Sequence, residues 1–277
     1  MREVTARMEA WLLAEGSTRP AGLLRIALAL LVWACWGSLF AAYSVKEPWR
    51  LGAALCFWPS STLMLLGWRS QWMALWCGAT LMFVYHYGGL VIGNADGWLH
   101  HHQYLLASAV LLSSFTPCGG SFSIDRWRSG APERGPRWGM SLIGFQLCCV
   151  YFWGAYDKVS WAWLSGARLE QIFRFFYFGS MPIPANASTA IAIATCLSIG
   201  LEFALAFGLF VPKARRVLLP MGLLMHAVFY LVLSVSTFSL TCIVMYLAFL
   251  DPDDVHDAID RLLGRQPTGS IDTRASL

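Results

Sequence analysis

Charged residues are scarce in this 277-residue sequence and make up 13% of it, against about 25% in a typical soluble domain. Hydrophobic residues make up 57% and aromatic residues 14%. So little charge leaves too little polar surface to cover a globule of this size. The composition therefore excludes the collagen-like, disordered and disulfide-scaffold classes and indicates an integral membrane protein.

Several functional signatures are also missing. No run of basic residues with interleaved aromatic residues occurs, which argues against nucleic-acid binding. The eight cysteines include no C-x-x-C pair, so we expect small buried hydrophobic residues, with neither a zinc site nor a redox pair. The N-terminal residues mix acidic, basic and apolar side chains, which predicts an amphipathic segment over residues 1–19 and argues against a cleavable signal.

Apolar segments fill most of the remaining chain. A helix needs about 20 predominantly apolar residues to cross the hydrocarbon core. The clear candidates are residues 21–43, 72–93, 103–117, 138–156, 187–211 and 217–233. Residues 51–67 are interrupted by Pro59 and form either a kinked crossing or an interfacial helix, and residues 237–250 are short for a crossing. We therefore predict an all-α, polytopic transmembrane helix bundle of about eight membrane segments over residues 20–250, with a short cytoplasmic tail at 251–277 and no soluble second domain.

Basic residues orient these segments, because cytoplasmic loops are enriched in Lys and Arg. Alternating crossings place most of them on one side: Arg2, Arg7, Arg19, Arg69, Arg126, Arg128, Arg134, Arg137, Lys213, Arg215, Arg216, Arg261, Arg265 and Arg274. Five others then lie outside: Lys46, Arg50, Lys158, Arg168 and Arg174. The prediction is a bacterial inner-membrane protein with both termini in the cytoplasm.

Ionisable residues inside membrane segments are costly, so each is a candidate for function. Lys158 is the sharpest, because Tyr151 and Gly154 precede it by seven and four residues and share its helix face. A lysine drawn into an apolar pocket is desolvated and can act as a general base near neutral pH. The alternative is a lysine at a helix end with its amine among the lipid headgroups.

The other ionisable residues leave similar alternatives open. His226 is either a hydrogen-bonded packing residue or an acid, base or ligand facing a cavity. Glu202 needs a partner, which is Arg25 or a serine in a structural bridge, or a substrate in a catalytic site. The three consecutive histidines at positions 100–102 lack metal-ligand spacing, so we expect no metal; one of them facing the cavity as a catalytic imidazole is the better hypothesis.

Three motifs taken together resemble the HTTM membrane-domain family over residues 20–250. The residues Pro117-Cys118-Gly119 and Ser123-Ile124-Asp125 resemble the family's P-C-G and S-L-D pattern. The stretch from Gln146 to Gly166 resembles its Q-x4-Y-x2-G-x3-K-L…W…G helix, with valine in place of leucine at position 159. His226 and the apolar span after it resemble a histidine segment of the family.

The resemblance implies a chemistry, since the characterised member of the family is the vitamin K-dependent gamma-carboxylase. There the lysine of the helix motif is the proposed base that deprotonates vitamin K hydroquinone; oxygen addition then gives a strong base that removes a glutamate γ proton, and the carbanion captures carbon dioxide. The resemblance thus implies Lys158 as the base, assisted by His102 and His226, with His101 where the family has asparagine. The implied co-reactants are a reduced vitamin K or menaquinol-type quinol, oxygen and, if carboxylation occurs, carbon dioxide.

These residues predict a quinone pocket on the outer side of the membrane. Its expected lining is His101, Tyr151, Gly154, Trp153, Trp161, Gln146 and Glu202. The carboxylase continues into a large lumenal domain that grips its protein substrate, so a protein or peptide substrate is left open here, while membrane lipid and a lipid-soluble quinone are the expected partners. The alternative hypotheses are a quinone-binding, lipid-binding or transport protein without catalysis, and a structural partner of another membrane enzyme.

Overall fold

A computed structural model describes residues 14–42, 47–92, 101–179, 185–233 and 235–265. These residues are largely helical, which confirms the predicted all-α class. The sheet among them is an antiparallel pair of three-residue strands, β1 (Glu15–Ser17) and β2 (Arg134–Pro136). The chain divides into two compact units, unit 1 (Met1–Gly144 and Leu233–Leu277) and unit 2 (Phe145–Val232), and each is described by itself.

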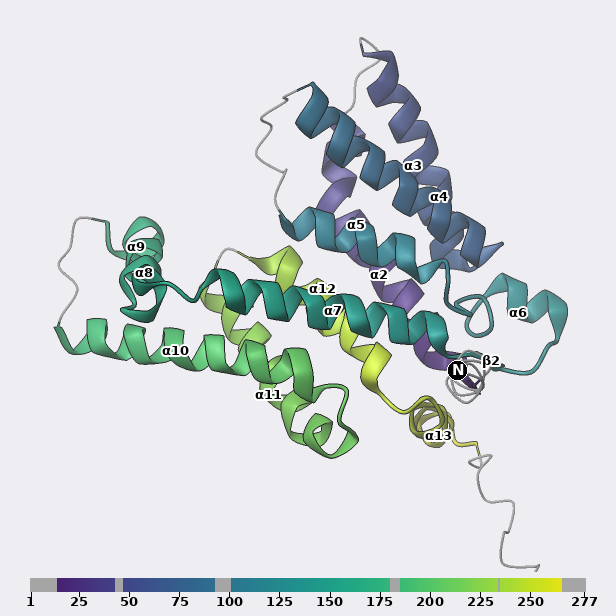
Figure 1. Ribbon diagram of the computed structural model, residues 1–277. Helices are drawn as coiled ribbons and strands as arrows, with labels where there is room; N and C mark the ends of the chain where they lie inside the picture. Colours follow the sequence, from purple (N-terminus) through teal and green to yellow (C-terminus); the bar gives the residue numbers. More distant parts are fainter. Residues whose placement is uncertain (1–13, 43–46, 93–100, 180–184, 234, 266–277) are drawn as a thin grey trace, which may run out of the picture. The chain divides into compact units, whose positions relative to one another are not determined.

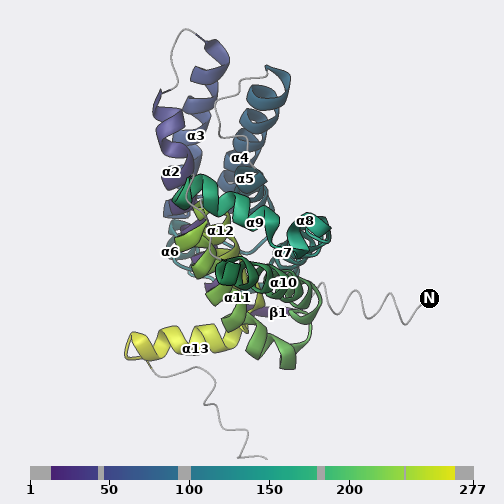
Figure 2. The same ribbon diagram turned by 90° about the vertical axis from the view of Figure 1, so that its left-hand side faces the viewer.

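Unit 1 contains the first helices of the chain and its last ones. They are α2 (Arg19–Ala42), α3 (Pro48–Leu66), α4 (Ser70–Phe83), the π-helix η1 (Val84–Val91), α5 (His101–Ser113), α6 (Ile124–Ser129), α12 (Ser236–Met245), the 3-10 helix η3 (Tyr246–Phe249) and α13 (Pro252–Leu262). Helices α2 to α5 pack in sequence order and α12 lies against α2 and α5 (Figure 1). Figure 2 shows α3 and α4 side by side from a second direction.

Aromatic stacking and one close helix contact hold unit 1 together. The rings of Phe40 on α2 and Phe57 on α3 stack with centroids 3.9 Å apart. Gly78 on α4 faces the backbone of Leu111 on α5, where a β-carbon would lie only 2.6 Å from the Leu111 nitrogen. Glycine therefore permits the close approach of α4 and α5, as small residues do at helix interfaces in membranes.

Unit 2 contains the second part of α7 (Trp138–Asp157), whose first residues belong to unit 1. The chain continues through α8 (Trp161–Leu164), α9 (Ala167–Phe173), the π-helix η2 (Arg174–Phe178), α10 (Ala185–Gly208) and α11 (Pro212–Val232). Helix α10 packs against α8, α9 and α11. Three long helices, α7, α10 and α11, contribute residues to the site described below.

Four of the described helices are long and apolar enough to cross a membrane: Arg19–Ala42, Trp138–Asp157, Ala187–Gly208 and Pro212–Val232. A membrane protein is therefore supported, whereas the count of about eight crossings stays a prediction. Each of the eight predicted segments coincides with one or two helices. Helix α3 continues through Pro59, and the hydroxyl of the next residue, Ser60, donates to the carbonyl of Cys56 at 2.7 Å.

The amphipathic segment predicted over residues 1–19 stays a prediction, because residues 1–13 lie outside the described part of the chain. Within the described part, Glu15–Ser17 form strand β1. Strand formation follows from pairing, because β1 finds a partner in β2, far along the chain. In the tail, Pro252–Leu262 form α13, which Asp251 caps by accepting from the backbone N–H groups of Asp253 and Asp254.

Candidate functional site

Lys158 lies immediately after the last residue of α7, where the chain turns. Its backbone N–H donates to the carbonyl of Ala155 at 3.0 Å, and its carbonyl accepts from Ser160 at 2.8 Å. The side chain folds back along the helix, and Nζ donates to the carbonyl of Gly154 at 3.0 Å. The last carbonyls of a helix lack intrahelical partners and carry partial negative charge, so a cation is favoured at this position.

Glu202, in the last third of α10, supplies the second partner of the Lys158 amine. Its carboxylate oxygens Oε1 and Oε2 lie 2.8 and 2.7 Å from Nζ. The Glu202 side chain is 4% exposed and that of Lys158 is 26% exposed. The ammonium group thus has three acceptors for its three N–H bonds, one of them at the end of its own helix and two from α10.

Gly154 keeps one side of this ion pair uncovered. A β-carbon built at this position would lie 3.7 Å from Nζ of Lys158 and 4.0 Å from Oε2 of Glu202. These are ordinary contact distances, so any side chain here would rest directly on the pair. The predicted placement of Gly154 beside the amine of Lys158 is therefore found in the structure.

A second hydrogen-bonded pair lies on the same face of α7. The hydroxyl of Tyr151 and Nε2 of His226, on α11, are 2.7 Å apart, and both side chains are buried. The ring of Phe229 packs edge-on against the His226 imidazole with centroids 6.0 Å apart. Either the phenol donates to an unprotonated Nε2 or a protonated Nε2 donates to the phenol oxygen, and both arrangements let a proton move along the bond.

The two pairs give unit 2 a row of proton-carrying groups in apolar surroundings. Tyr151 and Lys158 are seven residues apart, about two helical turns or roughly 10 Å along α7. Three helices contribute the row: α7 contributes Tyr151 and positions Lys158, α10 contributes Glu202, and α11 contributes His226. Such an arrangement can accept a proton from a substrate and stabilise the anion that remains.

Three other predicted site residues of unit 2 lie farther out. Trp153 is 58% exposed, and its ring packs edge-on against Phe152 and Tyr156. Trp161 is 82% exposed. Gln146 is half-buried on α7, about three turns before Lys158. The proposed role of these three residues in lining a quinone pocket stays a prediction.

The predicted histidines of α5 belong to unit 1. The His102 ring lies 5.4 Å from the ring of Phe238, centroid to centroid. His101 is the first residue of α5, and its side chain is outside the described part of the structure. Because Lys158 belongs to unit 2, the expected convergence of these histidines on the lysine stays a prediction.

Sequence reasoning missed the partner of Glu202. The sequence left Arg25 or a serine as its structural partner, and the structure gives Lys158 instead. Arg25 is buried in unit 1 and donates to the carbonyls of Cys118 and Phe122. Glu202 and Lys158 are 44 residues apart and on different helices, so no spacing rule connects them.

The capping of α4 by Asp125 was also not predicted from the sequence. Its carboxylate accepts from the backbone N–H groups of Arg69 and Ser70, each at 2.7 Å, and from the Ser70 hydroxyl at 2.9 Å. Asp125 therefore caps the start of α4 from a distant segment, while Ser123 caps α6 by accepting from the N–H of Arg126. The motif Pro117-Cys118-Gly119 with Ser123-Ile124-Asp125 is thus a structural element of unit 1.

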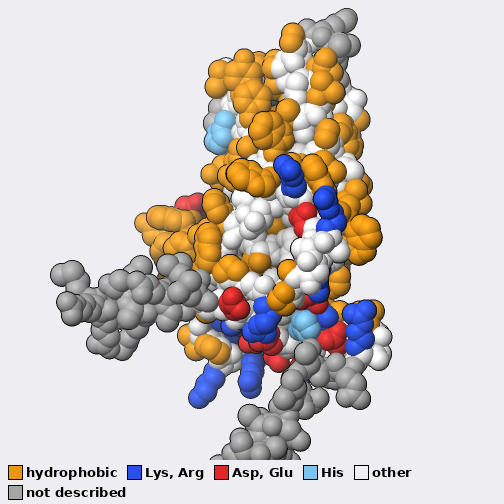
Figure 3. Space-filling view, turned by 90° about the vertical axis from the view of Figure 1, so that its right-hand side faces the viewer, with side chains coloured by type: hydrophobic (Ala, Val, Ile, Leu, Met, Phe, Trp, Pro, Cys, Tyr) orange, Lys and Arg blue, Asp and Glu red, His pale blue; other side chains and the backbone are white. Residues whose placement is uncertain are grey.

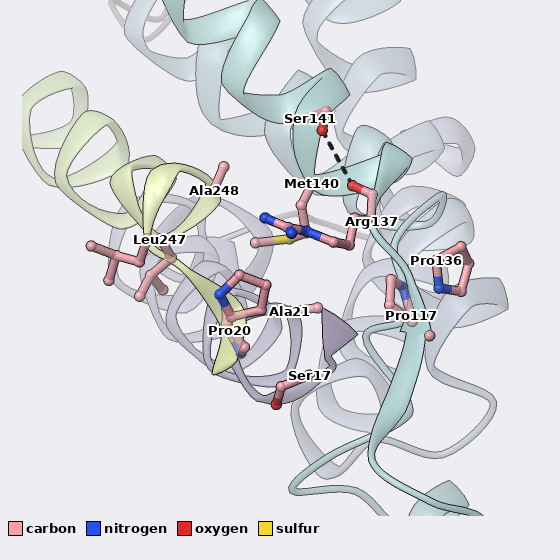
Figure 4. A pocket seen from close by; sticks show the side chains of 13 residues that line it. Ser17, Pro20, Ala21, Pro117, Pro136, Arg137, Met140, Ser141, Leu247 and Ala248 are labelled. Atoms are coloured by element: carbon pink, nitrogen blue, oxygen red, sulfur yellow. Dashed lines mark hydrogen bonds between the residues drawn. The ribbon is translucent and has the colours of Figure 1, made fainter. Parts of the chain in front are cut away.

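Unit 1 also encloses a small cavity of about 30 Å³, room for about one water molecule. It is lined by residues of β1, β2, α7 and η3, among them Ser17, Met140 and Leu247 (Figure 4). The hydroxyl of Ser141 donates to the carbonyl of Arg137 beside it. All its lining residues belong to unit 1, so this cavity is distinct from the Lys158 site.

Comparison with known proteins agrees with the motifs. The family model described as the HTTM domain matches residues 38–253, which include all of the site residues named above. No solved structure matches the chain.

Proposed function

The chain belongs to the HTTM domain family, and from that premise we propose that it is a membrane enzyme acting on a quinol-like, lipid-soluble substrate. The Lys158–Glu202 pair is its proton-accepting centre. The reaction is an oxygen-dependent one related to hydroquinone epoxidation, with or without carboxylation of a second substrate. Membrane lipid is the surrounding partner, and the substrate enters from it.

The observation that carries the proposal is the ion pair itself. A charged lysine and a nearly buried glutamate meet within 2.8 Å in a chain where few ionisable groups enter the apolar helices. Charged residues at membrane depth are expensive and mark substrate or proton pathways by default. The lysine occupies the position of the base in the motif of Gln146, Tyr151, Gly154 and Lys158.

The residues present fit a quinol. Its hydroxyl can donate to a carboxylate oxygen of Glu202 and, once ionised, accept from the ammonium of Lys158. Gly154 leaves the pair uncovered on one side, so a ring edge has access to both groups. A bound quinol of the reduced vitamin K or menaquinol type supplies the electrons that reduce oxygen, and carbon dioxide is the further reactant if carboxylation takes place.

We extend the proposal to the topology: eight crossings, both termini in the cytoplasm of a bacterial cell and the Lys158 site on the outer side. Contacts within unit 1 support the placement of its basic segments on the same side of the membrane. Strand β1 pairs with β2, Arg69 bonds to Asp125, and Arg134 lies 3.3 Å from Asp253. Basic-residue counts place all these segments on one side of the membrane. Figure 3 shows a mostly hydrophobic surface in the upper part of the view, with Lys, Arg, Asp and Glu side chains at mid-height and below.

Replacing Lys158 tests the proposed function. In membranes supplied with oxygen and a reduced quinone, Lys158→Ala is expected to lower quinol turnover by at least a hundredfold, because both the cation and the geometry of Glu202 are lost. The matched control is Arg168→Ala, which removes an exposed cation bonded to Gln171 in the same unit. Wild-type turnover in Lys158→Ala would contradict the proposal.

A second candidate function is a quinone-binding, lipid-binding or transport protein without catalysis. The saturation of both pairs favours it, since Lys158 with Glu202 and Tyr151 with His226 already satisfy one another. Quinone binding without oxygen consumption would support this alternative. Proton-coupled flux that is lost in His226→Ala would support its transport form.

A further inference from the structure

The surroundings of Lys158 Nζ match the donors of an ammonium group. Three acceptors surround the nitrogen: the carbonyl of Gly154 at 3.0 Å and the two oxygens of Glu202 at 2.8 and 2.7 Å. An ammonium group has three N–H donors and no acceptor, whereas a neutral amine has two N–H donors and a lone pair. An ammonium can donate to all three of these acceptors at once, and we assign the pair as an ammonium and a carboxylate on that basis.

We infer that Glu202 takes the proton of the phenolic substrate, while Lys158 stays protonated and stabilises the phenolate. In this step the O–H bond of the phenol breaks and an O–H bond to a carboxylate oxygen of Glu202 forms. The electron pair remains on the phenolate oxygen, which replaces the carboxylate as counter-ion of the Lys158 ammonium. This assignment rests on the proposed function and divides the roles within the Lys158–Glu202 pair.

Charge balance favours this division of roles. Before the step, the ammonium and the carboxylate sum to zero next to a neutral phenol; after it, the ammonium and the phenolate sum to zero next to a neutral acid. No net charge is created in an apolar site, where an uncompensated ion is expensive. If Lys158 were the base, it would first have to give a proton to Glu202 and lose the contacts that now hold it.

The other ionisable groups nearby fit the task less well. Asp157 is adjacent to Lys158 in sequence, but its side chain is exposed. The Tyr151–His226 pair lies about two helical turns away along α7. Glu202 is therefore the group that both contacts the cation and is nearly buried.

The assignment of Glu202 as the base is tested with substitutions that keep the positive charge at position 158 but remove one possible base at a time. Arginine keeps its positive charge and is not deprotonated in proteins, so Lys158→Arg can stabilise a phenolate but cannot act as a base. Glutamine keeps the shape of Glu202 but removes the basic carboxylate. The Lys158 side chain is 26% exposed, which leaves space for the larger guanidinium group.

The measurement is ionisation of a bound phenol, which requires neither oxygen nor turnover. The probe is a 4-nitrophenol with an alkyl chain, bound to the full-length protein in detergent micelles at a pH where the free probe is protonated; its phenolate is read by visible absorbance. We expect ionised probe with wild type and with Lys158→Arg, and at least a tenfold smaller ionised fraction with Glu202→Gln. Glu202→Asp, which keeps a carboxylate, is expected to restore part of the signal, and the unfolding temperature of each variant shows that it is folded.

Each outcome decides one question. Full ionisation with Glu202→Gln overturns the assignment, as does loss of ionisation in a folded Lys158→Arg that equals the loss in Lys158→Ala. If Lys158→Arg does not fold, the comparison of Glu202→Gln with Glu202→Asp decides alone. Failure of the wild type to ionise the probe while it turns over a reduced quinone also overturns the assignment, whereas absence of quinol turnover in wild type contradicts the proposed function itself.

Discussion

At the scale of single residues, several ionisable groups of the described apolar helices have specific partners. Lys158 pairs with Glu202, Tyr151 with His226, and Arg25 with backbone carbonyls. Removing one member of a buried ion pair leaves an uncompensated charge and costs about 3–5 kcal/mol. Replacing Lys158 leaves the carboxylate of Glu202, only 4% exposed, without its counter-ion, whereas replacing Glu202 leaves an ammonium that is 26% exposed; loss of Lys158 is therefore the more destabilising change.

Gly154 provides the sharpest single-residue prediction. Gly154→Ala places a methyl group in contact with both members of the ion pair, at 3.7 and 4.0 Å, without a clash. Alanine also favours a helix over glycine by about 1 kcal/mol. We therefore expect unchanged or slightly higher stability together with a loss of quinol turnover of about tenfold, because the access side of the pair is covered.

The matched control for Gly154→Ala is Gly200→Ala on α10, where a β-carbon meets nothing within 4 Å. It gains the same helix propensity and leaves the ion pair untouched. Turnover and thermal unfolding of the two variants are measured side by side. Equal turnover in Gly154→Ala and the control would show that the open side of the pair is not the access side.

At the scale of secondary structure elements, α4 depends on a residue far from it in sequence. Its first residues follow Gly67 and Arg69, which both have positive φ angles of 74° and 45°. Asp125 accepts hydrogen bonds from the backbone N–H groups of Arg69 and Ser70, which have no partner within the helix, and places a negative charge at the positive end of the helix. The start of α4 is therefore fixed by tertiary contact as well as by local sequence.

Asp125→Asn tests this capping role. Both carboxylate oxygens accept hydrogen bonds, so an amide of the same shape must turn its NH₂ group toward at least one N–H donor. The expected destabilisation is about 1–3 kcal/mol, the cost of an unsatisfied buried polar group. Denaturant or thermal unfolding measures it, with the exposed Asp254→Asn on α13 as control; equal effects of the two changes would remove the capping role.

The elements were predicted from sequence more completely than the site. Segment length and hydropathy located every long helix. A helix that is apolar on all sides appears in the sequence as one long apolar run, so it can be predicted without knowledge of the helices that pack against it. They missed the change from α4 to the π-helix η1 within the predicted segment 72–93, since hydropathy does not encode hydrogen-bond register. Helical spacing placed Tyr151, Gly154 and Lys158 on one face, but the pairing with Glu202 and His226 arises from helix packing, which spacing does not determine.

At the largest scale that the structure describes, the whole of unit 1, charged contacts connect its N-terminal strand, the segment before β2 and the tail. Arg19 lies 3.0 Å from Glu133 and 2.8 Å from Asp260, and it donates to the carbonyl of His256 at 2.8 Å. The hydroxyl of Ser17 bonds to Nδ1 of His256, 239 residues along the chain, at 2.9 Å. One buried arginine thus holds together three segments that local sequence does not connect.

The Arg19–Asp260 contact makes the stability of unit 1 depend on pH. The hydrogen bond from Arg19 lowers the pKa of Asp260 below its ordinary value, and the positive charge of Arg19 adds to this effect. A carboxyl group whose pKa is lower in the folded state stabilises the fold fully above its unfolded pKa of about 3.9 and loses that stabilisation as the pH falls through the folded pKa. Asp260→Asn is therefore expected to unfold at a lower temperature than wild type at neutral pH, with the two unfolding temperatures converging as the pH is lowered below about 4.

The exposed Asp254→Asn serves as the control, because the difference between its unfolding temperature and that of wild type should stay small at every pH. A gap between wild type and Asp260→Asn that stays constant or widens on acidification would show that Asp260 contributes through packing and that its charge is not what holds α13 to Arg19.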